Sequence, residues 1–261
     1  MSSRTAIGGF WDAHIRSWLD GADPLPDPLD AWFGSYSGRG LGAVTRDGFV
    51  EPFQGDLGGH ETEPRMVLLG LNPGQYLPDL QARDGLFAEE IRAAGSYSAW
   101  ARSAPYDRDP WLARYGPNRF YRGRRGFTRR WLGDPAAGYN DMLLWELYPW
   151  HSTAVVGRMS PPPHLIRQFV WDPIADIDVR YVFAFGAPWA QLAESDLKLQ
   201  PAGVFGRGGR DYGSTVASRS VRVFELSSRQ LLVTESHAGS AGPPSTDEVE
   251  RLRDALVSAK L

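Results

Sequence analysis

Two polar side chains, Asn72 and His237, each follow a short apolar run and are the residues best placed for chemistry. The first run, 66–69, has no alternation, so both faces of this predicted strand are expected to be buried. It ends on the segment Gly70-Leu71-Asn72-Pro73-Gly74. Proline lacks a backbone donor and glycine tolerates positive φ, so the chain must turn sharply here. Such a turn at the carboxyl end of a central parallel strand is where α/β sheets bind ligands, although a plain strand-to-helix turn has the same pattern.

His237 occupies the corresponding place after a second apolar run. Residues 231–234 predict another buried strand, and His237 opens a loop of small residues that precedes a predicted helix. A histidine of this kind is either a site residue or an ordinary hydrogen-bonded loop residue. The two polar residues are thus predicted at the ends of two strands that are far apart in the sequence.

Together the two segments resemble the two motifs of the uracil-DNA glycosylase superfamily. In its mismatch-specific and single-strand-selective branches the first motif is a strand followed by Gly-x-Asn-Pro-Gly, and residues 70–74 match it at every position. The second motif is a strand followed by His-Pro-Ser-Pro-x-Ser or a variant; His237 matches, whereas Ala238 and Gly239 replace Pro-Ser. The resemblance covers about residues 64–256 and leaves the first sixty or so uncovered.

The resemblance implies hydrolysis of an N-glycosidic bond after the nucleotide leaves the base stack. Asn72 would hold the attacking water by its amide oxygen. An amide is too weak a base to deprotonate that water early, so bond breaking should run ahead of attack. His237 would donate a hydrogen bond to the base O2 as negative charge grows there. The product would be an abasic site in DNA, and no metal is required.

Glu146 is the position where the sequence departs from uracil-reading relatives. There the end of the next strand, predicted here over 141–147, carries an asparagine; Pro149 aligns Glu146 with it. A carboxylate accepts from an exocyclic amine, such as N4 of cytosine, but repels O4 of uracil. This implies a modified cytosine of phage DNA as target, with anti-phage defence as the setting. If the register is off by one, Glu146 faces elsewhere and repair of uracil or another deaminated base is the alternative.

The resemblance also implies groups that stack on and surround the flipped base. Phe87 and Tyr76 are candidates for the stacking ring, although Phe87 could equally be a helix core residue. The other residues of the first motif would line the base pocket: Gly70, Leu71, Pro73 and Gly74. In the second loop, Ser240 and Ser245 are expected to contact DNA, and Ala241 or Pro243 to fill the gap left by the base.

The stretch 105–131 combines arginines with aromatic side chains. Arginines can neutralise phosphates while rings stack on bases, so we expect DNA contacts here. The DNA-binding candidates are Arg119, Arg122, Arg124 and Arg125. The alternative is a solvated loop with ordinary surface charge.

The composition of the chain limits the kinds of partner and cofactor site that we expect. The net charge is -3, which argues mildly against a nucleic-acid protein, but nearly all of the positive charge is arginine. The chain has no cysteine, so disulfides, thiolate metal sites and cysteine-ligated iron-sulfur clusters are excluded. We expect no cofactor, no membrane segment and no signal peptide, and hence a cytoplasmic monomer.

The predicted fold is a three-layer α/β/α sandwich with a central, mainly parallel sheet. Residues 64–261 would form it, and residues 1–63 a helical and irregular extension whose aromatic residues pack as core. Within 36–63 the only strand expected is a short one near Val44 or Phe49-Val50. The main predicted elements are strands over 66–70, 141–147, 180–185, 220–226 and 229–234, helices over 6–20, 85–102 and 246–260, and a Gly/Arg loop over 201–218.

Two other functions fit parts of the sequence. A non-catalytic DNA-binding relative would show steep salt dependence and leave no abasic sites. A small-molecule enzyme could use the same turn for a phosphate or sugar, although no Gly-x-Gly-x-x-Gly fingerprint follows a strand.

Overall fold

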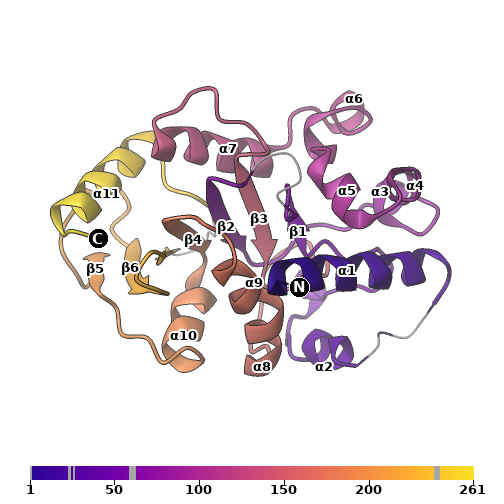
Figure 1. Cartoon of the computed structure of the whole chain (residues 1–261), viewed down its shortest axis with the longest axis horizontal. Coiled ribbons are helices and arrows are strands. Elements are labelled where there is room, and N and C mark those ends of the chain that lie inside the picture. Colours follow the sequence, from indigo (N-terminus) through magenta and orange to yellow (C-terminus); the bar gives the residue numbers. More distant parts are fainter. Residues whose placement is uncertain (1, 23–24, 26, 59–62, 238–241) are drawn as a thin grey trace. The chain divides into compact units, whose positions relative to one another are not determined.

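The structure, a computed structural model, describes all residues except 1, 23–24, 26, 59–62 and 238–241. It is an α/β fold with a seven-stranded mixed sheet in the order β1-β3-β2-β4-β7-β6-β5 (Figure 1). β2 pairs with β4 and β4 with β7 in parallel, whereas β6 and β5 follow antiparallel. The strands are β1 (Phe53–Gln54), β2 (Met66–Gly70), β3 (Met142–Glu146), β4 (Tyr181–Phe185), β5 (Gly203–Gly206), β6 (Ser220–Glu225) and β7 (Leu231–Ser236).

The chain divides into two compact units. The first unit comprises Met1–Glu63, Leu71–Pro105 and Leu144–Ile177, and the second comprises Pro64–Gly70, Tyr106–Leu143 and Asp178–Leu261. The division does not follow the single boundary near residue 63 that the sequence predicts, because both units take segments from distant parts of the chain.

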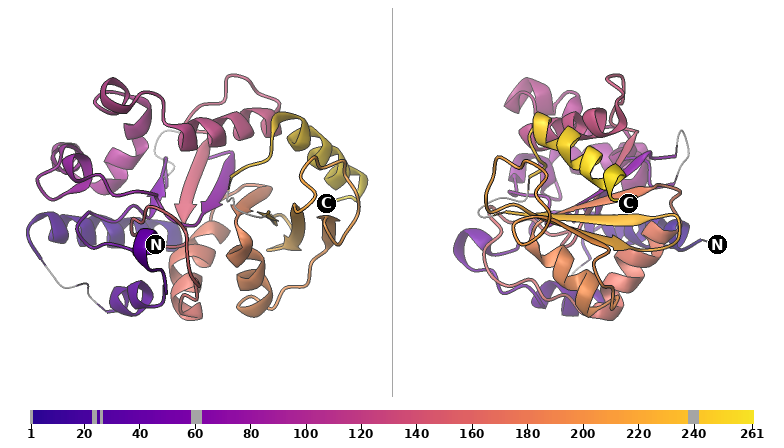
Figure 2. Two further views of the ribbon diagram at one scale, coloured as in Figure 1. Left: turned by 180° about the vertical axis from the view of Figure 1, so that it is seen from behind. Right: turned by 90° about the vertical axis from the view of Figure 1, so that its left-hand side faces the viewer.

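In the second unit, helices cover both faces of the strands. α7 (Arg119–Leu132) and α11 (Thr246–Ser258) lie on one face, and α10 (Ala187–Ser195) lies on the other (Figures 1 and 2). The Phe127 ring of α7 packs 4.8 Å from Phe183 of β4, and Trp131 packs 4.5 Å from the same ring. This layering is what the predicted α/β/α arrangement requires.

In the first unit, the N-terminal residues belong to the core. α1 (Ser3–Leu19) packs against α5 (Tyr97–Arg102) and α9 (Asp172–Ala175). Phe10 lies 4.9 Å from Phe169, ring to ring, and Trp11 and Trp32 are 0% and 1% exposed. The expectation that the aromatic residues of this region are core residues is confirmed for Trp11 and Trp32, whereas Phe10 is only half-buried.

The N-terminal region also supplies an edge strand, at a place the sequence did not indicate. β1 pairs antiparallel with β3, with Phe53 opposite Trp145 and Gln54 opposite Leu144. The expectation of a strand near Val44 or Phe49-Val50 is therefore wrong. Two residues are too few to show a period, and the pairing depends on the distant β3.

Two further element predictions need correction. The helix expected over 85–102 is two helices, α4 (Leu86–Ala94) and α5, because Gly95 has φ +81° and the Ser96 side chain caps α5 by accepting from the Ala99 N–H. The loop expected over 201–218 contains β5, which pairs antiparallel with β6. The remaining elements are α2 (Leu29–Gly34), η1 (Gly40–Gly42), α3 (Pro78–Gln81), η2 (Pro105–Asp107), α6 (Trp111–Tyr115), α8 (Pro163–Ile166), the π-helical η3 (Arg167–Trp171) and α9.

Among the described residues, no helix is both long and apolar enough to cross a membrane.

Candidate functional site

The predicted turn after β2 is present. β2 ends at Gly70, and Gly74 adopts φ +91°, a conformation that glycine reaches without strain. Backbone hydrogen bonds tie the turn to the segment after β3: Tyr148 N donates to Leu71 O at 2.9 Å, and Ser152 N donates to Gly74 O at 3.0 Å. The turn is therefore held at both ends.

Ser152 fixes the orientation of the Asn72 side chain. The Asn72 Nδ2 donates to Ser152 Oγ at 2.7 Å and approaches the Ser152 carbonyl at 3.4 Å. A serine hydroxyl has one proton, and Ser152 uses it toward the Ala154 carbonyl at 3.0 Å, so toward Asn72 it can only accept. The amide nitrogen of Asn72 is therefore the atom that faces Ser152.

The amide oxygen of Asn72 consequently points away from Ser152. Within the described part of the chain, no donor is hydrogen-bonded to this oxygen, and the side chain is 9% exposed. A fixed acceptor that remains available is what holding a water molecule requires. Sequence reasoning missed Ser152, which stands 80 residues away with nothing in its surroundings to link it to Asn72.

A buried polar network lies beside this turn in the first unit. Glu51, 1% exposed, accepts from Gln81 Nε2 at 2.9 Å and from Gln54 Nε2 at 3.2 Å. The His151 Nε2 lies 3.5 Å from Glu51 Oε1, and burial lowers the pKa of His151 to about 4, so its ring is neutral near pH 7. Glu51 was missed because it lies in the irregular stretch 36–63, where no period marks a buried position.

Glu146 is the last residue of β3 and is 6% exposed. Its backbone N–H donates to Pro52 O at 3.0 Å, which anchors the strand end. The structure thus places Glu146 at the carboxyl end of its strand, as predicted. Its contact with a base stays a prediction.

The two candidate stacking rings differ in burial. Phe87 is 0% exposed, and its ring packs 5.1 Å from that of Trp100 between α4 and α5. The stacking role is wrong for Phe87 in this conformation, because no face of the ring can reach a base. Tyr76 is half-buried, its hydroxyl donates to Asp47 O at 3.2 Å, and its ring lies 6.4 Å from His151. Tyr76 remains the candidate.

In the second unit, His237 follows β7 and contacts a buried carboxylate. The His237 Nδ1 lies 3.2 Å from Glu235 Oε1, and the same oxygen is ion-paired with Arg219. Burial raises the pKa of Glu235 to about 7, against the opposing effect of Arg219. Burial, with Arg219 nearby, lowers the pKa of His237.

Glu248 holds Arg219 from the other side. The Arg219 guanidinium lies 3.2 Å from Glu248 Oε2, and Glu248 Oε1 accepts from Ser214 Oγ at 2.7 Å and Thr215 N at 2.9 Å. Burial works against ionisation, but these hydrogen bonds and Arg219 outweigh it and lower the pKa of Glu248 to about 2. Ser245, a predicted DNA contact, caps α11 and donates to Glu248 Oε2 at 3.1 Å. Ser240 and Ala241 lie outside the described residues.

The arginine-rich stretch is helical rather than a loop, and its arginines divide into two kinds. Arg119 and Arg122 of α7 are exposed, as DNA contact requires. Arg124 is 4% exposed, with its guanidinium 3.4 Å above the Phe120 ring, and Arg125 is ion-paired with Asp107. The DNA-contact prediction is therefore wrong for the buried Arg124, and Arg125 is already engaged.

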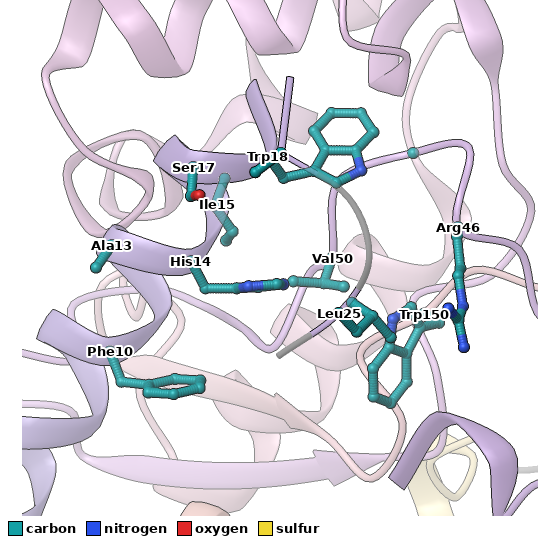
Figure 3. Close-up of a pocket in the computed structure, with 12 residues that line it drawn as sticks. Phe10, Ala13, His14, Ile15, Ser17, Trp18, Leu25, Arg46, Val50 and Trp150 are labelled. Carbon is teal, nitrogen blue, oxygen red and sulfur yellow. The ribbon is translucent and has the colours of Figure 1, made fainter. Parts of the chain in front are cut away.

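A separate cavity of about 310 Å³ lies in the first unit (Figure 3). α1 contributes Phe10, His14 and Trp18 to its lining, and Trp150 lines it as well. Burial lowers the pKa of His14 to about 4. Asn72 is not among the lining residues, so this cavity is distinct from the predicted site. The described residues contain no group of three His, Cys, Asp or Glu side chains that could hold a metal ion.

Asn72, Tyr76 and Glu146 thus belong to the first unit, and His237 with Glu235 belongs to the second. That the two groups meet over one substrate stays a prediction. No protein-family model, curated protein or solved structure matches this chain.

Proposed function

We propose that this chain is a monofunctional DNA glycosylase that flips a base and hydrolyses its N-glycosidic bond, leaving an abasic site. The observation that carries the proposal is the Asn72 amide, whose nitrogen is bound by Ser152 and whose oxygen is left to accept from a water. An acceptor fixed in this way can place a nucleophile without being a strong base.

The strand order supports a ligand site at the carboxyl end of β2, which Asn72 follows. β3 lies on one side of β2 and β4 lies on the other, so the strand order of the sheet reverses at β2. In open α/β sheets, ligands bind outside the carboxyl ends of the strands at such a switch point. Asn72 follows the carboxyl end of β2 by two residues.

In the proposed reaction, the glycosidic bond breaks with positive charge on the sugar and negative charge on the base. The Asn72 oxygen accepts a hydrogen bond from the water that attacks C1′. His237 donates to O2 of the departing base, where the charge develops. Losing such a donor typically costs about 2.7–4 kcal/mol of transition-state stabilisation, or about 10²–10³-fold in rate.

Glu146 supports a cytosine-type base as the target. It stands buried at the end of β3, where a carboxylate can accept from an exocyclic amine. We therefore propose a modified cytosine, such as phage DNA contains, and defence against phage as the setting.

The test is a panel of oligonucleotides that carry cytosine, modified cytosines, uracil or other deaminated bases. Incubation with the protein and then with alkali should cleave the strand at the abasic site. Asn72→Ala should abolish cleavage, and Asn140→Ala, which removes an amide outside the turn, should not. Glu146→Asn should shift the preference from amine-bearing bases toward uracil. Binding without cleavage of any member would contradict the enzyme and favour a non-catalytic DNA-binding protein.

A further inference from the structure

Two loops of the first unit carry an exposed apolar tip. They comprise residues 37–42 and 153–158, and we call them the paired loops. Six large hydrophobic residues are exposed in the described part of the chain, and three of them stand here: Leu41 at 70%, Val156 at 53% and Val155 at 42%. Single exposed apolar residues are ordinary on a protein surface, whereas three together on two loops that bond to each other form a patch that a partner can cover.

Hydrogen bonds hold the paired loops against each other. The Tyr36 hydroxyl donates to Val156 O at 2.8 Å and accepts from Val156 N at 2.9 Å, and Ala154 N donates to Leu41 O at 2.9 Å. The two backbones also lie close together, since a Cβ added to Gly42 would come within 2.7 Å of Val156 O. The backbone that presents Leu41 is therefore fixed in advance, which lowers the entropy lost when the tip binds.

The paired loops are joined to the proposed site through Ser152. The Ser152 hydroxyl accepts from Asn72 Nδ2 and donates to Ala154 O at 3.0 Å. Ala154 N in turn donates to the Leu41 carbonyl, and Ser152 N is bonded to Gly74 O of the turn. The exposed tip therefore stands beside the turn that would hold the attacking water, within the same compact unit. A nucleic acid whose nucleotide entered the site would meet this surface.

Two arginines flank the tip. Arg39 precedes Leu41 by two residues, Arg158 follows Val156 by two, and both are exposed. Neither forms an ion pair with any residue that the structure describes. Free guanidinium groups beside an apolar tip suit duplex DNA, which carries phosphates outside and stacked bases inside. A stable protein interface instead buries about 800 Å² per partner, more than three side chains provide.

We propose that the paired loops are a DNA wedge: Leu41 enters the base stack beside the extruded nucleotide, and Arg39 and Arg158 contact backbone phosphates. The inference rests on the proposed glycosylase function and identifies how its duplex substrate is opened. Extruding a base costs unstacking and unpairing free energy, and an apolar side chain that fills the gap offsets this cost. Leucine is large enough for this role, whereas the sequence offers only the smaller Ala241 or Pro243 in the loop after β7.

The test compares cleavage of the best oligonucleotide as a duplex and as a single strand, because only the duplex has paired bases to separate. Leu41→Ala removes three carbon atoms, so on the duplex kcat/KM should fall by about 10- to 60-fold if most of that surface is buried between bases. On the single strand it should stay unchanged. Leu112→Ala is the matched control, because it makes the same change at an exposed leucine of α6 in the second unit, and it should alter neither rate. Equal losses on both substrates, or no loss on the duplex, would overturn the wedge.

A second measurement needs no cleavage. The fluorescent base 2-aminopurine, placed next to the target base in a duplex, brightens when it loses its stacking partner. The unmodified protein at saturation should raise this fluorescence, and Leu41→Ala should raise it much less. Arg39→Ala and Arg158→Ala should keep the rise at saturation but each reduce the slope of log affinity against log salt by about 0.9.

The two measurements separate the wedge from the glycosylase. A fluorescence rise that depends on Leu41, in a protein that cleaves no oligonucleotide, would support the wedge and contradict the glycosylase. Cleavage of a duplex by the unmodified protein without any fluorescence rise would overturn the wedge and leave the glycosylase standing, whether or not the variant folds.

Discussion

The Ser152→Ala substitution tests how far the orientation of one amide governs the proposed reaction. It removes the 2.7 Å hydrogen bond from Asn72 Nδ2 and leaves only the longer contact to the Ser152 carbonyl, at 3.4 Å. A hydrogen bond of this kind contributes about 0.5–1.5 kcal/mol net. If the productive orientation of Asn72 loses that free energy, the rate constant should fall by about 2- to 13-fold. Asn72→Ala removes the oxygen itself and should be far more severe.

The assay is single-turnover cleavage of the best oligonucleotide, at a temperature well below the melting transition of every variant. Ser35→Ala is the control, because it deletes a serine hydroxyl in the same unit that contacts Tyr148 and the Trp32 carbonyl but not Asn72. The double variant Asn72→Ala/Ser152→Ala should match Asn72→Ala. An unchanged rate in Ser152→Ala, or a loss as large as that of Asn72→Ala, would refute a purely orienting role.

Three further predictions concern other parts of the chain. Phe87→Ala should lower the free energy of unfolding by about 3–5 kcal/mol in denaturant titrations, because the ring is wholly buried, and leave the rate per folded molecule unchanged. Arg119→Ala and Arg122→Ala should each reduce the slope of log affinity against log salt by about 0.9 on duplex DNA. Arg124→Ala should instead lower the stability of the fold. If Arg124→Ala changed the salt slope without lowering stability, the burial of Arg124 would be contradicted. Because the pKa of Glu235 is raised from 4.5 to about 7, folding takes up a proton there, whereas His14 and His151, whose pKa values are lowered from 6.5 to about 4, release protons on folding and oppose this effect. The contribution of Glu235 should therefore appear as a difference: as pH rises from 4.5 to 7, the free energy of unfolding of the unmodified protein should fall relative to that of Glu235→Gln.

The ends of β2 and β7 could be predicted from the sequence because their signals are local. An unbroken apolar run reports burial on both faces, and Asn72-Pro73-Gly74 cannot continue a strand. The pairing of β1 with β3 could not be predicted from the sequence. β1 has two residues and exists because Phe53 meets Trp145, whose position in the chain says nothing about Phe53.

The arginine-rich helix shows why composition alone misleads about burial. Phe120, Arg124, Phe127 and Trp131 are spaced four, three and four residues apart, so they share one helical face. Arg124 therefore stands within an apolar stripe, and the spacing already contained the signal that it is covered. Counting arginines between aromatic residues favoured DNA contact for all of them, whereas the period separates Arg124 from the exposed Arg119 and Arg122.

The partners of the two proposed site residues are likewise of two kinds, local and distant in the sequence. Glu235 precedes His237 by two residues in a strand, so the period of two places both side chains on one face, and the β6–β7 hairpin register adds Arg219. This part of the site could be predicted from the sequence. Ser152 could not, because its hydroxyl reaches Asn72 only through the path of the chain after β3. The residues that contact the two proposed site groups therefore follow from strand register where they are local, and only from the structure where they are distant in the sequence.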